Sequence, residues 1–198
     1  MLKDFVKQVE IRWKQMYGEK PTGDENMGKM VNDFHTNRVA QLLETAGGTV
    51  ICGGKVNREA KYIEPTIILQ PDLESKMMKE EIFGPVMPVF PFKTINEVIK
   101  FINERDKPLA VYYFGQAGSV NSRRLCAETS SGAFVMNEVI GHIYSHTMGF
   151  GGVGKSGYGR HGGFEGFKNF SNRKGILYKA PAPKAINEAT LPPFSNKM

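Results

Sequence analysis

Two adjacent carboxylates and an aromatic ring stand close together in residues 80–86, which read Glu-Glu-Ile-Phe-Gly-Pro-Val. The next residues, 87–92, are apolar enough to enter a buried sheet. Carboxylates at the end of a buried strand commonly hold a polar ligand, such as a sugar hydroxyl, against an apolar wall. The heptapeptide suits an acidic loop before a core strand equally well, so alone it leaves both interpretations open.

A second unusual stretch, residues 149–160, matches two phosphate-binding patterns, Gly-x-x-x-x-Gly-Lys-Ser and Gly-x-Gly-x-x-Gly. Both patterns bind phosphate only where a helix begins directly after them, because the free N–H groups of the helix hold the anion. Residues 157–163 contain four glycines, which cannot form a stable first helical turn. We therefore reject both sites and predict a bending, mobile, glycine-lined rim in which Phe150 is the one large apolar side chain.

The cysteines and histidines favour no catalytic or metal site. Cys52 and Cys126 have neither a disulfide framework nor the spacing of a metal site, so we interpret both as packing residues. His142 and His146 lack a third ligand at a fitting offset. The sequence thus predicts no metal ligand, and a reducing compartment such as the cytoplasm or mitochondria.

Composition excludes several other classes of function. The 198 residues are 40% hydrophobic and 23% charged, which is ordinary for a soluble globular protein. The net charge of +6 comes from scattered lysines and arginines, so we expect no nucleic-acid partner. No apolar run approaches the length of a membrane span, no signal sequence is evident, and the tail 180–198 is polar and proline-rich, so we expect no membrane anchor.

Hydrophobic periodicity predicts the elements that position these residues. In the N-terminal half they are a helix over 2–17, a helix over 32–45, a strand over 49–52, a turn over 53–61 and a longer strand over 62–69. After the apolar run, they are a helix from Ile95 that Thr94 and Glu97 cap, a strand over 108–114, a helix over 119–129 and a strand over 133–136.

Alternating strands and helices with short connections predict an α/β fold with a parallel sheet. Ligands of such sheets lie beyond the carboxyl ends of the strands, where Asn137 is expected. Asn137 could equally be a plain turn residue.

With these two stretches in view, the sequence resembles the C-terminal part of the aldehyde dehydrogenase superfamily. Residues 80–86, called the acidic motif below, resemble the family, as does the Gly-Phe-Gly-Gly-Val-Gly-Lys-Ser-Gly segment that begins at Gly149. The resemblance is closest to the family's class 3, fatty-aldehyde-type branch. Further matching segments follow in the family's order: residues 62–66, 107–112, 128–132, 167–173 and 191–193. The resemblance implies a partial α/β catalytic domain over 1–172, an oligomerisation strand over 173–178 and a tail over 179–198, without the N-terminal dinucleotide-binding domain.

The resemblance also implies roles for four residues. Glu81 would hydrogen-bond the nicotinamide ribose of NAD or NADP, and Phe83 would pack against the nicotinamide end. Phe150 would line the aldehyde pocket, with Asn137 near it. The family usually has a proline before Phe-Gly-Gly, whereas this chain has Gly149, which should loosen the rim around Phe150.

Aldehyde oxidation in this family needs a cysteine nucleophile, and neither cysteine here falls at the family's position. The resemblance thus implies part of an NAD(P)-dependent aldehyde dehydrogenase, with no catalytic residue of its own, that acts on an aldehyde together with another protein chain. The alternative is a truncated pseudoenzyme that serves as a structural or assembly subunit.

Overall fold

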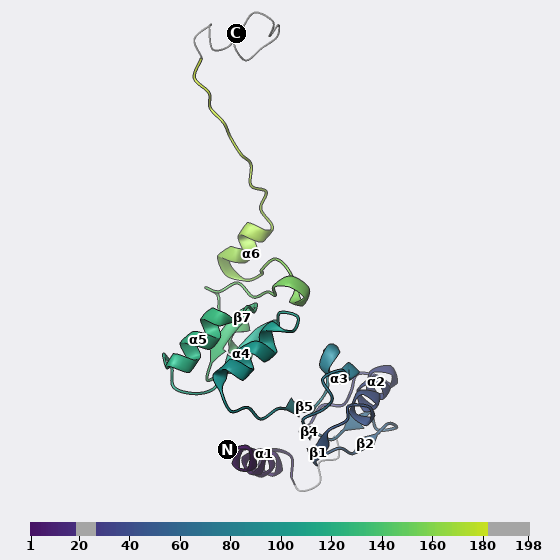
Figure 1. Cartoon of the computed structure of the whole chain (residues 1–198). Helices are drawn as coiled ribbons and strands as arrows, with labels where there is room; N and C mark the ends of the chain where they lie inside the picture. Colours follow the sequence, from purple (N-terminus) through teal and green to yellow (C-terminus); the bar gives the residue numbers. More distant parts are fainter. Residues whose placement is uncertain (19–26, 182–198) are drawn as a thin grey trace, which may run out of the picture. The chain divides into compact units, whose positions relative to one another are not determined.

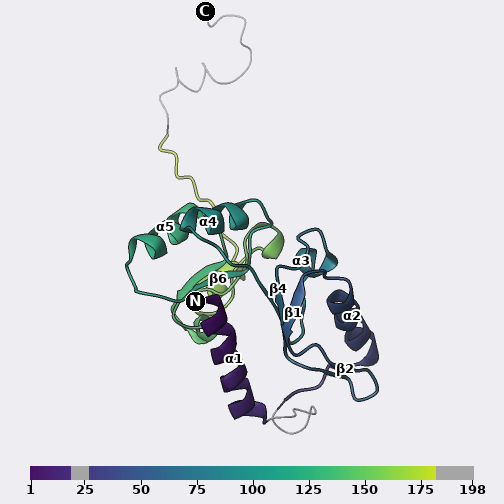
Figure 2. The same cartoon turned by 60° about the horizontal axis from the view of Figure 1, so that its bottom comes forward.

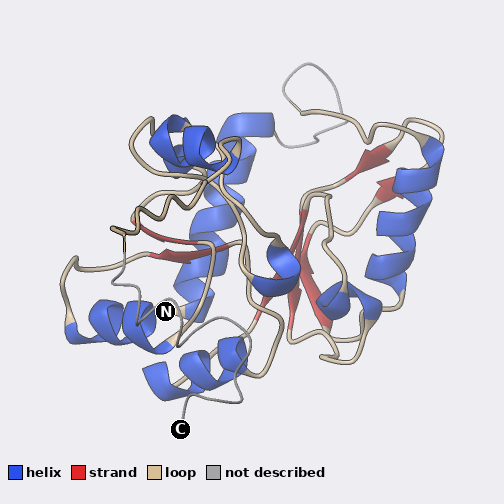
Figure 3. Ribbon diagram, turned by 90° about the horizontal axis from the view of Figure 1, so that it is seen from above, coloured by secondary structure: helices blue, strands red, loops and turns tan. Residues whose placement is uncertain are grey.

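Helices and short strands alternate along the chain in the computed structural model, which describes residues 1–18 and 27–181 (Figure 1). The end of the predicted tail, residues 182–198, lies outside the described residues. The chain divides into two compact units between Thr94 and Ile95, and each is described by itself. Figure 3 shows that the strands are short and that helices and loops make up most of the described chain.

The first unit is built on a three-stranded sheet in the order β1-β4-β5, with β4 antiparallel to β1 and parallel to β5. A separate hairpin pairs β2 with β3. The elements of this unit are α1 (Leu2–Tyr17), α2 (Asp33–Glu44), β1 (Thr49–Cys52), β2 (Val56–Asn57), β3 (Tyr62–Ile63), β4 (Thr66–Leu69), α3 (Lys76–Lys79) and β5 (Val86–Val89).

The core of this unit lies between α2 and the sheet. Its buried members are Val39, Leu42, Ala46, Ile63, Ile68, Met77 and Val86. On α2, Val39 and Leu42 belong to this buried core, while Leu43 is only partly buried against it. By contrast, α1 covers Leu2–Tyr17 as predicted but buries none of its residues.

One strand prediction in this unit is wrong. The expected strand over 62–69 is broken into β3 and β4, and the expected turn over 53–61 contains β2. Pro65 has no N–H to donate to a ladder, which interrupts the pairing at this point. Just after it, the Thr66 hydroxyl donates to the Glu64 carbonyl at 2.6 Å and accepts from Gly54 N at 2.9 Å.

The second unit contains a β-α-β arrangement in which β6 and β7 run parallel, with Val111 opposite Phe134. Helices α4 and α5 pack against each other (Figure 2) around the buried side chains of Ile99, Val111 and Leu125. The elements are α4 (Ile95–Asn103), β6 (Ala110–Tyr113), α5 (Val120–Glu128), β7 (Ala133–Met136), the 3-10 helices η1 (Gly141–Tyr144) and η2 (Gly154–Ser156), and α6 (Gly163–Asn169).

The predicted α/β class is confirmed, since β4/β5 and β6/β7 are both parallel pairs. The sequence predicted a single parallel sheet, whereas these two pairs belong to separate sheets. Residues 173–178, expected as a strand, form no strand in this chain and continue as an extended trace after α6 (Figure 1). A strand needs a neighbour for its backbone groups, and no described segment pairs with this one.

Candidate functional site

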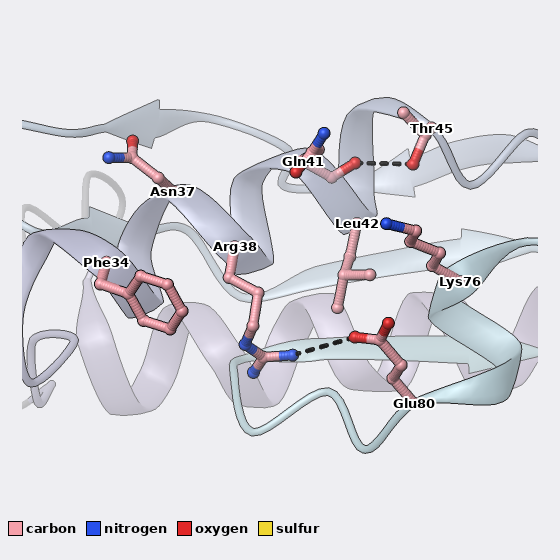
Figure 4. A pocket seen from close by; sticks show the side chains of 8 residues that line it. All are labelled: Phe34, Asn37, Arg38, Gln41, Leu42, Thr45, Lys76 and Glu80. Carbon is pink, nitrogen blue, oxygen red and sulfur yellow. Dashed lines mark hydrogen bonds and ion pairs between the residues drawn. The ribbon is translucent and has the colours of Figure 1, made fainter.

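The side chain of Arg38, on α2, is hydrogen-bonded to the acidic motif. Its guanidinium donates one hydrogen bond to the Glu81 carbonyl at 3.2 Å and another to the Ile82 carbonyl at 2.6 Å. The same group lies 3.9 Å from the Glu80 carboxylate, an approach that Figure 4 shows. A charged donor therefore holds two successive carbonyls of a segment that lacks helix or strand hydrogen bonds of its own.

A close approach of backbone to helix fixes the same motif on its other side. A Cβ built at Gly84 would lie 2.8 Å from Val39 Cγ1, so only glycine lets the chain pass this close to α2. One residue earlier, Phe83 has a φ of 43°, which is costly for an aromatic residue. The ring of Phe83 is 76% exposed, so this strained backbone conformation directs the ring toward solvent rather than into the core.

Glu81 lies on the surface between these two anchors. Its side chain is exposed and makes no ion pair or hydrogen bond within the described parts of the chain. Arg38 binds its backbone carbonyl and leaves its carboxylate free. The motif thus offers an unpaired carboxylate two residues from an outward-facing ring, which suits a ligand with hydroxyl donors beside a flat group.

Next to the motif, a cavity of about 610 Å³ runs along α2 (Figure 4). Its size falls within the range of small-molecule sites. Arg38 and Glu80 lie at one side of it, so the cavity and the acidic motif are neighbours. The lining residues are Phe34, Asn37, Arg38, Gln41, Leu42, Thr45, Lys76 and Glu80.

In the second unit, Phe150 is held by its backbone. It exchanges two hydrogen bonds with His161, from Phe150 N to His161 O at 2.8 Å and from His161 N to Phe150 O at 3.0 Å. Arg160 Nη1 donates to the carbonyls of Gly132 and Gly149, at 2.9 and 3.1 Å. Both flanks of Phe150 are therefore hydrogen-bonded to neighbouring residues, in the rim that the sequence predicts to be loose.

The glycines of this segment are needed for packing rather than for phosphate binding. A Cβ at Gly132 would collide with the carbonyl oxygen of Gly151, and one at Gly152 with that of Ser156. After Ser156 the chain enters Gly157 with a φ of 136°, and the next α-helix begins only at Gly163. Neither phosphate pattern runs directly into an α-helix, which is the context that phosphate binding at such patterns requires.

The ring of Phe150 lies in a row of aromatic side chains. Its centroid is 5.5 Å from that of His142 and 5.3 Å from that of His161, and Tyr112 lies 5.9 Å beyond His142. These separations are typical of favourable aromatic pairs. Both ring nitrogens of His142 are buried without a hydrogen-bond partner among the described residues, so this imidazole acts as an aromatic spacer behind Phe150.

Asn137 lies at the carboxyl end of β7, as expected, in a left-handed conformation with a φ of 56°. Its amide group is already engaged: Oδ1 accepts from Gly115 N at 2.8 Å and Nδ2 donates to Gly115 O at 3.0 Å. Asn137 therefore joins the loops that follow β6 and β7. Both ends of its side chain are satisfied by this backbone contact.

The two free cysteines occupy different environments. Cys52 is half-buried, and burial raises the pKa of its thiol, with smaller contributions from Glu10 and Glu64. Cys126 is exposed on α5, so its interpretation as a packing residue is wrong. The helix pattern placed it beside Leu125, but only Leu125 faces the core.

Within residues 1–18 and 27–181, no group of three or more His, Cys, Asp or Glu residues could hold a metal ion. No helix in those ranges has the length and apolar character that crossing a bilayer requires.

Sequence reasoning placed Glu81, Phe83 and Phe150 in their motifs but missed Arg38 and Gly84 as anchors. The helix predicted over 32–45 is present as α2, and Val39 is one of its buried residues. Nothing in the sequence says that the preceding arginine reaches carbonyls 43 and 44 residues further along. The Gly-Pro pair in the motif was a usable signal, since a glycine beside a helix stripe permits close approach.

Comparison with known proteins gives a consistent result. Residues 1–176 match the description "Aldehyde dehydrogenase family". The mouse protein "Aldehyde dehydrogenase, dimeric NADP-preferring" is 40% identical over 195 residues, which are 98% of this chain and 42% of the mouse protein. "Aldehyde dehydrogenase family 3 member A2" of Pongo abelii is 38% identical over 191 residues, covering 96% of this chain and 39% of that protein.

Solved structures agree with this result. The "Substrate bound state of Staphylococcus Aureus AldH" superposes with a TM-score of 0.80 at 30% identity, over 98% of this chain and 42% of that one. Lactaldehyde dehydrogenase from Escherichia coli superposes with a TM-score of 0.73 at 27% identity, over 85% of this chain and 36% of that one. The chain thus spans less than half the length of these relatives.

Proposed function

Because the chain belongs to the aldehyde dehydrogenase family, we propose that it forms part of an NAD(P)-dependent enzyme that oxidises aldehydes to carboxylic acids. The chain spans 42% of the mouse relative, so the activity would belong to an assembly that includes more protein than this chain. The observation that carries the proposal is the acidic motif, in which a fixed backbone presents a free carboxylate and an exposed ring.

Glu81 and Phe83 are proposed to contact the cofactor. A free carboxylate is a good acceptor for ribose hydroxyls, and an exposed aromatic ring offers a flat surface for a nicotinamide. Arg38 supports this role by holding the carbonyls of Glu81 and Ile82. The backbone that carries the carboxylate and the ring is therefore fixed before the cofactor binds, which lowers the entropy cost of binding. When bound, NAD or NADP would accept hydride from the substrate.

Phe150 and Asn137 are proposed to belong to the aldehyde side of the enzyme. Phe150 offers an apolar wall whose position is set by His161 and His142. Asn137 would shape the edge of the pocket by fixing the end of β7, since its amide is bonded to Gly115.

We assign the nucleophile to neither cysteine of this chain. The attacking species is a thiolate, and the raised pKa of Cys52 disfavours that form. Cys126 is exposed on α5, where no base is bonded to it among the described residues. The reactive thiol would then come from protein outside this chain, and the chain by itself would not oxidise aldehydes.

A reconstitution experiment tests this function. The chain is mixed with a polypeptide that carries the part of the family it does not span, and NADH or NADPH formation from hexanal is followed. We expect activity only in the mixture, retained in a Cys52→Ala, Cys126→Ala double variant.

Glu81→Gln should weaken cofactor affinity by roughly tenfold, the loss expected for one charged hydrogen bond, whereas Glu59→Gln, at an exposed glutamate of the same unit, should not.

Two results would overturn the proposal. Turnover by the chain alone that disappears in the double cysteine variant would mean that it carries its own nucleophile. Cofactor affinity that is equal for Glu81→Gln and Glu59→Gln would remove the acidic motif from the cofactor site.

A second candidate function, a structural or assembly subunit, is favoured by the exposed apolar residues near the C-terminal end. Six large apolar side chains lie within fifteen positions, and each is at least 67% exposed. Exposed apolar surface of this kind commonly marks an interface. The six are Phe164, Phe167 and Phe170 in and after α6, followed by Ile176, Leu177 and Tyr178.

Sedimentation velocity, combined with the turnover assay on the reconstituted mixture, distinguishes the two candidates. In the assembly function, the chain associates with protein through residues 173–178, and Leu177→Asp abolishes the complex. Association without any cofactor-dependent turnover in the reconstituted mixture would favour this second function. If the chain stayed monomeric at all concentrations, both alone and with the polypeptide used for reconstitution, this second function would be contradicted.

A further inference from the structure

Gly149 stands where the family usually has a proline, and the structure shows what occupies the space beside it. A Cβ built at Gly149 would lie 2.6 Å from Glu165 Cβ and 2.9 Å from Glu165 Cγ. Contacts this short do not occur between real side chains, and the obstructing atoms belong to the root of a side chain, which cannot swing away. Glu165 lies on α6 and is half-buried, with its carboxylate bonded to the Lys168 ammonium.

The contact matters because it lies one residue before Phe150. A proline would restrict φ at this position through its ring, whereas glycine alone leaves the backbone free. Here Glu165 packs against one side of Gly149, and Arg160 holds its carbonyl at 3.1 Å. The backbone of Gly149 is therefore restricted by packing against Glu165 of α6, rather than by a pyrrolidine ring of its own.

We propose that Glu165 is a positioning residue: its Cβ and Cγ fill the space beside Gly149 and thereby fix the direction in which Phe150 points. The proposal rests on the proposed function only in so far as Phe150 lines the aldehyde pocket. It predicts that Gly149 and Glu165 are energetically coupled, because an added methyl at one position needs the removal of a side chain at the other.

The histidines provide a native readout of Phe150. The chain has four histidines, and two of them, His142 and His161, lie with ring centroids 5.5 and 5.3 Å from that of Phe150. The imidazole signals of these two, observed by NMR with carbon-13-labelled histidine in the full chain, therefore sense movement of the Phe150 ring. His35 belongs to the other unit and serves as an internal reference.

We expect Glu165→Gly and Gly149→Ala each to shift the His142 and His161 signals while leaving His35 in place. Glu165→Gln, which keeps Cβ and Cγ, should leave all three unchanged. Combining Gly149→Ala with Glu165→Gly should return the signals toward their wild-type positions. Gly175→Ala is the control, since an added Cβ there would have open space around it and would touch neither histidine.

The proposal is overturned if Glu165→Gly leaves the two signals unchanged or if Glu165→Gln shifts them as much as glycine does. This comparison stands even where Gly149→Ala fails to fold. In the reconstituted enzyme, Glu165→Gly should raise the aldehyde KM by roughly tenfold with little change in kcat. If the signals respond as expected but Phe150→Ala leaves aldehyde kinetics unaltered, the positioning role holds and the assignment of Phe150 to the pocket fails.

Discussion

The acidic motif of the first unit and the glycine-rich segment of the second unit (residues 149–160) are both irregular backbone held in fixed positions, but by different means. Side chains hold the acidic motif: Arg38 binds two of its carbonyls, and Val39 packs against Gly84. In the glycine-rich segment, backbone also packs directly on backbone, and Gly132 faces the carbonyls of Gly151 and Leu109.

This difference determines how each region responds to substitution. A guanidinium or a methyl group can rotate, so an error at a side-chain anchor is partly relieved. A carbonyl in a packed backbone can move only if its strand or loop moves with it. We therefore expect the second unit to be the more sensitive to added atoms, and the first to depend on single polar contacts.

The largest effect is expected for Gly132→Ala. The new Cβ would lie 2.5 Å from the Leu109 carbonyl oxygen and closer still to that of Gly151. Relief requires separation of β6 from β7, and overpacking of this kind costs about 3 kcal/mol or more. Hydrogen exchange at Ala133, whose amide donates to Leu109 O at 3.0 Å, would report the opening.

Gly175→Ala is the control for this substitution, because a Cβ there has open space around it. It should change the free energy of unfolding by a few tenths of a kcal/mol. Equal stability of the two variants would show that the glycine-rich segment is not packed as described.

The second largest effect is expected for Arg38→Met. The variant keeps much of the apolar stem but leaves the Glu81 and Ile82 carbonyls without their charged donor, at a cost of about 2 kcal/mol. Unfolding in urea followed by the fluorescence of Trp13, the single tryptophan of the chain, measures this loss.

Arg58→Met is the matched control, since Arg58 also pairs with a glutamate, Glu44 at 2.6 Å, but on an exposed surface. Exposed pairs contribute at most about 1 kcal/mol. If both variants lost the same stability, Arg38 would be one more surface charge rather than the anchor of the motif.

A smaller effect is expected for Gly84→Ala. Its Cβ would meet Val39 Cγ1 at 2.8 Å, and this methyl can shift with the side chain, so we expect a loss of about 1–2 kcal/mol. Val39→Ala in the same chain should make the two substitutions less than additive. Strict additivity in this double-mutant cycle would mean that the glycine and the valine do not touch.

The sequence predicted the local elements of this fold better than their partners. Periodicity located α1, α2 and α4, and the alternation of apolar segments located β7. These features depend on neighbours a few residues apart. The break at Pro65 was also visible in principle, because proline removes a ladder donor, although the apolar run around it favoured one strand.

Pairing and anchoring could not be predicted in the same way. That β5 pairs with β4 rather than β6 depends on contacts between distant segments. The same holds for the reach of Arg38 and for the fit of Glu165 against Gly149, which depend on side-chain geometry. The candidate site residues were found through family motifs, whereas the residues that hold them emerged only from the structure.

The smallest expected effect is a difference in alkylation rate between Cys52 in the first unit and Cys126 in the second. Burial raises the pKa of Cys52 in the first unit, with further contributions from Glu10 and Glu64, so at neutral pH it holds less thiolate than an ordinary cysteine. Since the thiolate is the nucleophile, iodoacetamide should label Cys52 more slowly than exposed Cys126, and the Cys52 rate should climb at pH values above the usual thiol range.

The same shift sets the sign of a stability effect. A raised folded-state pKa gives stability that is complete below the unfolded thiol pKa and is lost as pH rises through the folded value. Glu10→Gln and Glu64→Gln should each speed labelling of Cys52 slightly, by less than unfolding does, because burial is the larger cause. Mass spectrometry of timed samples, with Cys52→Ser as the control, measures both rates. Equal labelling of the two thiols across the pH range would remove the physical ground for excluding Cys52 as a nucleophile.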